Sequence, residues 1–192
     1  MSFTNKDIIK IQKSLKSKLK DSRYQHTLGV AFTAASMAMK YSIDINKAYV
    51  AGLLHDCAKY MESEEMLVKA QKFKLDISNA EKVKPDLLHA KLGAYYAKKK
   101  YGVEDDEILS SICSHTTGKP NMSLLDKIVY IADYIEPNRY KMPRLDLIRK
   151  KAFEDIDECL CMILEDTVSY LEETGVYMDE TTLKTYEYYC NK

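Results

Sequence analysis

The chain has 192 residues with 29 basic and 29 acidic side chains, so its formal net charge is zero. This length suits a single domain over residues 1–192, and the balanced charge argues against a nucleic-acid duplex as partner. No apolar run approaches the roughly 20 residues of a membrane span, and the first residues carry no apolar signal core. We therefore expect a cytoplasmic protein with no membrane partner.

The five cysteines, at positions 57, 113, 159, 161 and 190, are odd in number and form no Cys-x-x-Cys motif. Neither a disulfide framework nor a zinc ribbon fits this pattern, and reduced thiols are expected. Cys57 follows Asp56 on a predicted helix and so points about 100° away from it, which favours core packing over metal ligation.

Apolar residues recur every three or four positions, and glycine and proline are sparse (6 and 4), which predicts an all-α fold. The first helix is expected over about 5–19. A second runs from Ser22, a suitable N-cap, to about residue 41. Its apolar stripe is predicted to comprise Tyr24, Leu28, Ala31, Phe32 and Ala35. His26 lies off this stripe, and Gly29 leaves room there for a partner helix.

The third predicted helix is capped by Asp44 or Asn46 and extends over 48–56. It carries His55 and Asp56, and Lys59 follows four residues after His55, so on a helix all three side chains can converge on one site. A charged carboxylate in this apolar segment is costly unless it is compensated. A divalent metal ion is one such compensation.

In the middle of the chain, an acid-rich helix start at 62–65 precedes a polar surface helix and loop over 69–84. Pro85 opens a helix that carries His89 and ends at Gly102. Another helix begins at 104–106 and ends at His115, before a loop rich in hydroxyls. Ser123 caps the most apolar helix, predicted over 124–136, which contains Asp133.

After Pro137, a basic loop over 138–144 leads to a long amphipathic helix expected over 145–173 and stopped by Gly175. Thr181 is expected to cap a last short helix. The chain therefore divides into a candidate metal core, about 20–140, and a C-terminal long helix with a short capping helix, 145–192.

The candidate metal ligands are His26, His55, Asp56 and Asp133, with His89 and His115 as further imidazoles. Imidazoles and carboxylates without thiolate suit iron, manganese or zinc better than calcium. Such an ion lowers the pKa of bound water and polarises a phosphoryl oxygen. A single helical histidine is more often a core or surface residue, so the prediction depends on the whole set.

Basic residues near these ligands could neutralise phosphate charge. Arg23 and Lys59 are the nearest candidates in sequence, and Arg139 could bind phosphate in two-pronged fashion. Arg139, Lys119 and Arg144 either bind phosphate in this way or are simply solvated. Together with the ligands they describe metal-assisted hydrolysis of a phosphate ester or anhydride.

The order His26, then His55-Asp56, then Asp133 on helices resembles the HD-domain phosphohydrolase superfamily. The segments 23–27, 52–59, 112–118 and 131–139, and the ending 181–186, resemble its YqeK-like bacterial branch of symmetrical diadenosine tetraphosphate hydrolases. The resemblance covers nearly the whole chain.

This resemblance implies an iron ion held by His26, His55, Asp56 and Asp133, with manganese or zinc as alternatives and one or two ions in all. His89 and His115 could hold a second metal. Metal-activated water would attack a central phosphorus and release two ADP, with Asp56, Lys59 and Asp133 as catalytic residues. The residues expected to face phosphates are Arg23, Lys59, His89, His115, Thr116 and Arg139, and those expected near the base are Val176, Tyr177, Met178, Asp179, Glu180 and Thr181.

The sequence is also compatible with two other functions. One is a nucleotidase or phosphodiesterase of the same superfamily that acts on other nucleotides. The other is a non-catalytic sensor that binds a nucleotide on the same scaffold. A small nucleotide is the expected ligand in each case, and two copies of the chain could form a homodimer.

Overall fold

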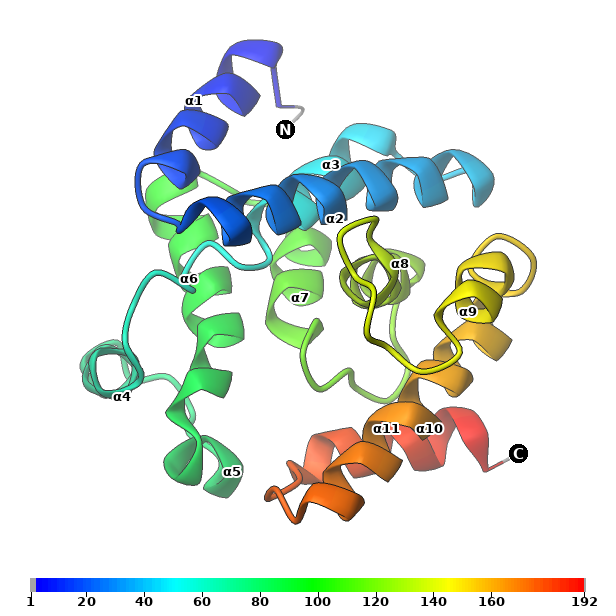
Figure 1. Cartoon of the computed structure of the whole chain (residues 1–192). Helices are drawn as coiled ribbons and strands as arrows, with labels where there is room; N and C mark the ends of the chain where they lie inside the picture. The colour runs from blue at the N-terminus through cyan, green and yellow to red at the C-terminus, as the bar shows by residue number, and fades with distance from the viewer. Residues whose placement is uncertain (1–2, 192) are drawn as a thin grey trace.

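Helices form the regular structure of the computed structural model, which describes residues 3–191 (Figure 1). No strand occurs within that range, which confirms the all-α prediction. In chain order the elements are α1 (Asn5–Lys16), α2 (Asp21–Lys40), α3 (Ile45–Leu54), α4 (Ser63–Lys72), α5 (Asn79–Val83), the 3₁₀ turn η1 (Pro85–Leu88), α6 (His89–Tyr101), α7 (Asp106–Ser114), α8 (Leu124–Ile135), α9 (Leu145–Lys151), α10 (Ile156–Thr174) and α11 (Glu180–Cys190).

The central helices α2, α3, α7 and α8 pack against one another, and α6 covers α7 on one side while α10 and α11 lie beyond α8 (Figure 1). Gly52 lets α3 approach α2 closely, because a β-carbon there would lie 2.9 Å from the Cα of Ala31. One apolar cluster extends from Ile11 to Tyr189. None of the helices in residues 3–191 combines the length and apolarity that crossing a bilayer requires.

The buried face of α2 differs from the predicted stripe. His26, Val30, Ala34 and Met37 are buried, whereas Phe32 is 59% exposed. Because α2 contacts α1, α3 and α8, tertiary packing decides which side faces the core. The predicted stripe is therefore only partly confirmed: Ala31 is buried, and Tyr24 and Leu28 pack against the core, but Phe32 does not, and His26 lies on the face that points inward.

Side-chain caps account for most of the helix starts. Asp44 accepts from the N–H of Lys47, and Ser123 forms a capping box with Asp126, as predicted. Two predicted caps were wrong. Helix α2 begins at Asp21 without a side-chain cap, and α11 is capped by Asp179 rather than Thr181.

Several predicted helices have different bounds in the structure. The helix with His55 stops at Leu54, and turns follow. The segment that Pro85 opens is first a 3₁₀ turn and becomes α-helical at His89. The long helix expected over 145–173 is two helices, because the chain turns at 152–155 and Asp155 caps α10 by accepting from the backbone N–H groups of Asp157 and Glu158.

The cysteines only partly follow the prediction of reduced thiols. A disulfide joins Cys161 of α10 to Cys190 of α11, where the two helices bring the Cα atoms to 5.4 Å. Cys57, Cys113 and Cys159 are free. Cys57 packs in the core, as expected, and burial raises its pKa to about 12.

Candidate metal centre

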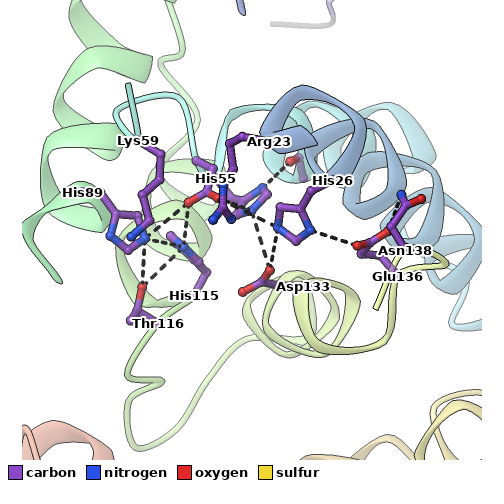
Figure 2. A network of polar contacts seen from close by, with 12 residues as sticks. Arg23, His26, His55, Lys59, His89, His115, Thr116, Asp133, Glu136 and Asn138 are labelled. Carbon is purple, nitrogen blue, oxygen red and sulfur yellow. Dashed lines mark hydrogen bonds and ion pairs between the residues drawn. The ribbon is translucent and has the colours of Figure 1, made fainter. Parts of the chain in front are cut away.

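Four histidines converge on one buried point, as Figure 2 shows. His26 comes from the second turn of α2, His55 follows the end of α3, His89 opens α6, and His115 follows the end of α7. The ring centroids of His55 and His115 lie 4.9 Å apart, and those of His89 and His115 are separated by the same distance. The ring centroids of His26 and His55 lie 5.3 Å apart. Residues almost 90 positions apart thus form a single cluster.

Three of these rings are oriented by the same local device. The Nδ1 atoms of His55, His89 and His115 lie 2.6, 2.6 and 2.7 Å from the carbonyl oxygen three residues earlier. Each histidine stands at the end of α3, η1 or α7, where carbonyl groups lack helical partners. A carbonyl only accepts, so Nδ1 carries the proton and Nε2 of the neutral ring keeps its lone pair.

The fourth ring, His26, is oriented by a carboxylate instead. Its Nδ1 lies 3.0 Å from Oε1 of Glu136, a side chain only 1% exposed. The other oxygen of Glu136 accepts from the backbone N–H and the side-chain amide of Asn138. A carboxylate that accepts from Nδ1 fixes the orientation of an imidazole and makes it a better metal ligand.

The Nε2 atoms that remain face one another. Those of His89 and His115 are 3.0 Å apart, and burial together with His115 lowers the pKa of His89 to about 3. The Nε2 atoms of His26 and His55 are buried without a hydrogen-bond partner. Lone pairs that face one another in a buried site favour a cation between them, so the donor set fits a divalent metal.

Asp56 lies at the centre of the cluster and is 2% exposed. Its Oδ2 is 3.4 Å from Nε2 of His55, and its Oδ1 is 3.3 Å from Nε2 of His89 and 3.6 Å from that of His115. Although burial opposes ionisation, these imidazoles hold the pKa of Asp56 well below its ordinary value. Oδ2 of Asp56 therefore faces His55, whereas its Oδ1 faces His89 and His115.

Asp133 completes the cluster from α8. Its Oδ1 lies 2.9 Å from Nε2 of His26 and 3.8 Å from that of His55. Burial alone would lower the pKa of His26, but the carboxylates of Asp133 and Glu136 raise it above its ordinary value. Three groups of residues offer ligand atoms within 4.8 Å of one another, namely His26, His55 and Asp56; His55, His115 and Asp133; and Asp56, His89 and His115.

Two arginines pair with the two aspartates. Nη1 of Arg23 lies 2.9 Å from Oδ2 of Asp56, and Nη2 of Arg139 lies 2.8 Å from Oδ1 of Asp133. Both guanidinium groups remain partly exposed beside the cluster. Both arginines therefore lie beside the cluster, and their predicted contact with phosphate stays a prediction.

The other predicted basic residues have different partners. Lys59 donates to Asp86 at 2.6 Å, and the helix on which it was expected to align with His55 ends at Leu54. Lys119 donates to Ser110 and pairs with Asp126. Arg144 pairs with Asp166 and Glu165, which attaches the loop after α8 to α10.

A cavity of about 550 Å³ opens beside the cluster. His115, Thr116, Asp133 and Arg139 line it, and so do three residues of the predicted base segment, Val176, Tyr177 and Asp179. Glu180 and Thr181 line a neighbouring hollow, and Met178 lies outside both linings. The volume is in the range of small-molecule sites, about 300–1,000 Å³.

Sequence reasoning missed two acidic residues in this region. Glu136 contacts His26, and Asp86 holds Lys59. Glu136 directly follows the apolar helix α8 and precedes Pro137, so its burial could have been suspected. Asp86 carried no such signal, because it stands in a polar stretch.

Comparison with known proteins agrees with this geometry. Residues 23–138 match the family model described as HD domain. A protein of Halalkalibacterium halodurans named bis(5'-nucleosyl)-tetraphosphatase, symmetrical, is 40% identical over 90% of this chain and 91% of its own length. A Bacillus subtilis protein of the same name is 37% identical over 91% of this chain and 92% of its own. The crystal structure of a predicted HD superfamily hydrolase involved in NAD metabolism from Clostridium acetobutylicum superposes with a TM-score of 0.92 at 37% identity, over 100% of this chain and 99% of that one.

Proposed function

The chain belongs to the HD-domain family, and we propose that it is a hydrolase that cleaves diadenosine tetraphosphate symmetrically into two molecules of ADP. Two relatives of that name, similar over about nine-tenths of the chain, support this substrate. The observation that carries the proposal is the set of inward-facing Nε2 atoms and two carboxylates beside a nucleotide-sized cavity.

We propose that His26, His55, Asp56 and Asp133 hold the first divalent ion. Iron is the proposed metal, with manganese and zinc as alternatives, because imidazole and carboxylate donors suit all three. Asp56 could share a second ion with His89 and His115, since its Oδ1 faces both rings. A bound divalent ion lowers the pKa of a water molecule and polarises a phosphoryl oxygen.

The chain's own side chains supply binding and orientation. Arg23 and Arg139 carry guanidinium groups that suit phosphate oxygens, and Lys59 adds positive charge beside His89. Thr116, within 3.3 Å of Nε2 of both His89 and His115, offers a hydroxyl to the same phosphates. The proposed base contacts come from the segment 176–181, of which Val176, Tyr177 and Asp179 line the cavity.

In the proposed reaction, water adds to one of the two central phosphorus atoms and the central P–O–P bond breaks. The leaving ADP takes the bridging oxygen, and the proton from water balances the charge. Asp56, Lys59 and Asp133 are the proposed catalytic residues. Residues of about 20–140 would form the metal core, and 145–192 would close the nucleotide side of the cavity.

Chromatography of the products tests this proposal. Metal-loaded protein incubated with diadenosine tetraphosphate should yield ADP as the sole nucleotide product, and a matched sample treated with chelator should yield none. ATP plus AMP would contradict symmetrical cleavage. Turnover of nucleoside monophosphates or cyclic nucleotides instead would favour the nucleotidase alternative, and tight binding without ADP would favour a sensor.

The expected homodimer is a separate part of the proposal. Sedimentation equilibrium of the full chain tests it directly, because one and two copies differ twofold in mass. A single mass of about 22.1 kDa would contradict the homodimer.

A further inference from the structure

The cavity beside the cluster has a second wall, away from the segment 176–181. This wall comes from α8, from the loop that follows it and from α10. Its main side chains are Tyr130, Tyr134, Met142, Ile163, Asp166 and Tyr170. A dinucleotide has two nucleosides, and the contacts proposed above account for only one base.

The second wall is connected to the metal cluster through α8. Tyr130 precedes Asp133 by three residues, so both side chains lie on one face of the helix, about 4.5 Å apart along its axis. Arg139, which pairs with Asp133, lines the same cavity. A phosphate bound near Asp133 and Arg139 would therefore place an attached nucleoside within reach of this wall.

The chemistry of the second wall suits a purine base. Its aromatic and aliphatic side chains offer flat, apolar contact area, and bases stack on such aromatic rings. Tyr130 is 5% exposed and Tyr170 is 61% exposed, so the wall has a buried floor and an accessible rim.

One carboxylate stands in this apolar wall. Oδ1 of Asp166 accepts from Nε and Nη2 of Arg144, at 3.0 and 2.5 Å. Its Oδ2 accepts only from the hydroxyl of Tyr134, at 3.2 Å. A carboxylate oxygen has two acceptor sites, so Oδ2 can accept one more hydrogen bond. The exocyclic amino group of adenine is a donor that fits this position.

We propose that this wall is the subsite for the second nucleoside of the dinucleotide, and that Oδ2 of Asp166 accepts from the amino group of its purine base. This inference rests on the proposed function, because a substrate with two nucleosides requires two such subsites. One base then lies against 176–179 and the other between α8 and α10, with the phosphates across the metal cluster.

Equilibrium dialysis of the Mn²⁺-loaded full chain with ADP tests the subsite without catalysis. Wild-type protein should bind two ADP molecules per chain. Tyr170→Ala and Asp166→Asn should each weaken one of the two by roughly tenfold, the size expected for one stacked or hydrogen-bonded base. Tyr188→Ala is the matched control, because this tyrosine is 50% exposed and packs on Tyr189 rather than in the cavity.

The amino group can be tested by replacing ADP with IDP, which has a carbonyl oxygen in that position. IDP should bind the second subsite less tightly than ADP, and Asp166→Asn should reduce the difference. Circular dichroism and thermal unfolding of each variant should match the wild type. Tyr170→Ala, at an exposed position, keeps the test valid if Asp166→Asn folds poorly.

The results separate this inference from the proposed function. One ADP per chain, or two ADP molecules that Tyr170→Ala and Asp166→Asn leave unchanged, would overturn the subsite whatever the catalytic activity. If two ADP bind as expected but diadenosine tetraphosphate is not cleaved, the subsite stands and the proposed reaction fails.

Discussion

The carboxylate of Glu136 lies in the space that a side chain at position 29 would occupy. A β-carbon on Gly29 would come within 2.2 Å of Oε2 of Glu136. The sequence had indicated close approach at Gly29, and the approaching group is this buried carboxylate. Since Glu136 orients His26 through Nδ1, Gly29 controls a metal ligand without touching it.

We therefore expect Gly29→Ala to displace Glu136 and release the ring of His26. Metal affinity should fall by about 10- to 100-fold, as for other carboxylates that support a ligand histidine. Glu136→Gln should produce a loss of the same kind, and competition with a chromogenic chelator measures both. Ser36→Ala, on the exposed side of α2, serves as the control. Unchanged affinity in Gly29→Ala would show that the geometry of His26 does not depend on Glu136.

Asp56→Ala should remove both bound metal and hydrolysis, because Oδ2 of Asp56 faces His55 while its Oδ1 faces His89. His89→Ala should keep the ion assigned to His26, His55, Asp56 and Asp133 while hydrolysis falls. Elemental analysis by mass spectrometry, combined with product assays, checks both variants. Complete loss of metal in His89→Ala would mean that the ligands have been assigned to the wrong ion.

Arg139→Ala should lower kcat/KM by roughly 10- to 100-fold, which is the effect expected from the loss of one charged hydrogen bond. The metal content should stay the same. Arg139→Lys should recover only part of the loss, because an ammonium group cannot bind phosphate in two-pronged fashion. Steady-state kinetics and metal analysis on the same preparations separate the effects. If Arg139→Ala loses its metal, the pairing of Arg139 with Asp133 supports the ligand rather than the substrate.

The pKa of Asp179 predicts a dependence of stability on acid. Burial alone would raise this pKa, but hydrogen bonds from Ser78 and from the backbone of Thr181 lower it below 3.8. A lowered pKa stabilises the fold above the unfolded-state value of about 3.9, and this contribution is lost as the pH falls through the folded-state value. Asp179→Asn should therefore lower the free energy of unfolding at pH 6. The difference in this free energy between the variant and the wild type should shrink between pH 4 and pH 2.

Urea unfolding at several pH values measures this difference. Glu180→Gln is a suitable control, because the neighbouring carboxylate is exposed. If the difference in unfolding free energy between wild type and Asp179→Asn does not change with pH, ionisation of Asp179 contributes nothing to stability.

The disulfide between Cys161 and Cys190 closes a loop of 29 residues. For a loop of this length, chain entropy predicts a contribution of about 3–4 kcal/mol to the free energy of unfolding. Dithiothreitol should lower the urea midpoint of the wild type, and Cys190→Ala should be equally unstable with and without the reductant. If the reductant leaves the wild-type midpoint unchanged, the two thiols are not joined in solution.

The sequence predicted the helical class and the His and Asp residues of the cluster, because these depend on local signals. Ser123 and Asp44 cap helices wherever the chain folds, and a carboxylate inside the apolar run around Asp133 requires a partner. The family resemblance added His89, which by itself would have been interpreted as a core residue.

Tertiary contacts determined what the sequence could not predict. Nothing in the apolar run 48–56 marks a stop at Leu54, yet His55 takes the carbonyl of Gly52 that the N–H of Asp56 would need in a continuing helix. The buried face of α2 depends on three neighbouring helices, and the partner of Lys59 is a residue 27 positions away. Local sequence patterns do not predict contacts between residues so far apart in the chain.

The pairing of Arg23 with Asp56 and of Arg139 with Asp133 has a consequence for the order of binding. In these two ion pairs, the guanidinium groups and the carboxylates neutralise one another. If Asp56 and Asp133 held a divalent cation, their charge would be neutralised by it, and both guanidinium groups would be free to bind phosphate. Metal and nucleotide should therefore each strengthen the binding of the other by the same factor, because such coupling is reciprocal. Each arginine would then neutralise a carboxylate before the metal binds, and would bind a phosphate group of the substrate afterwards.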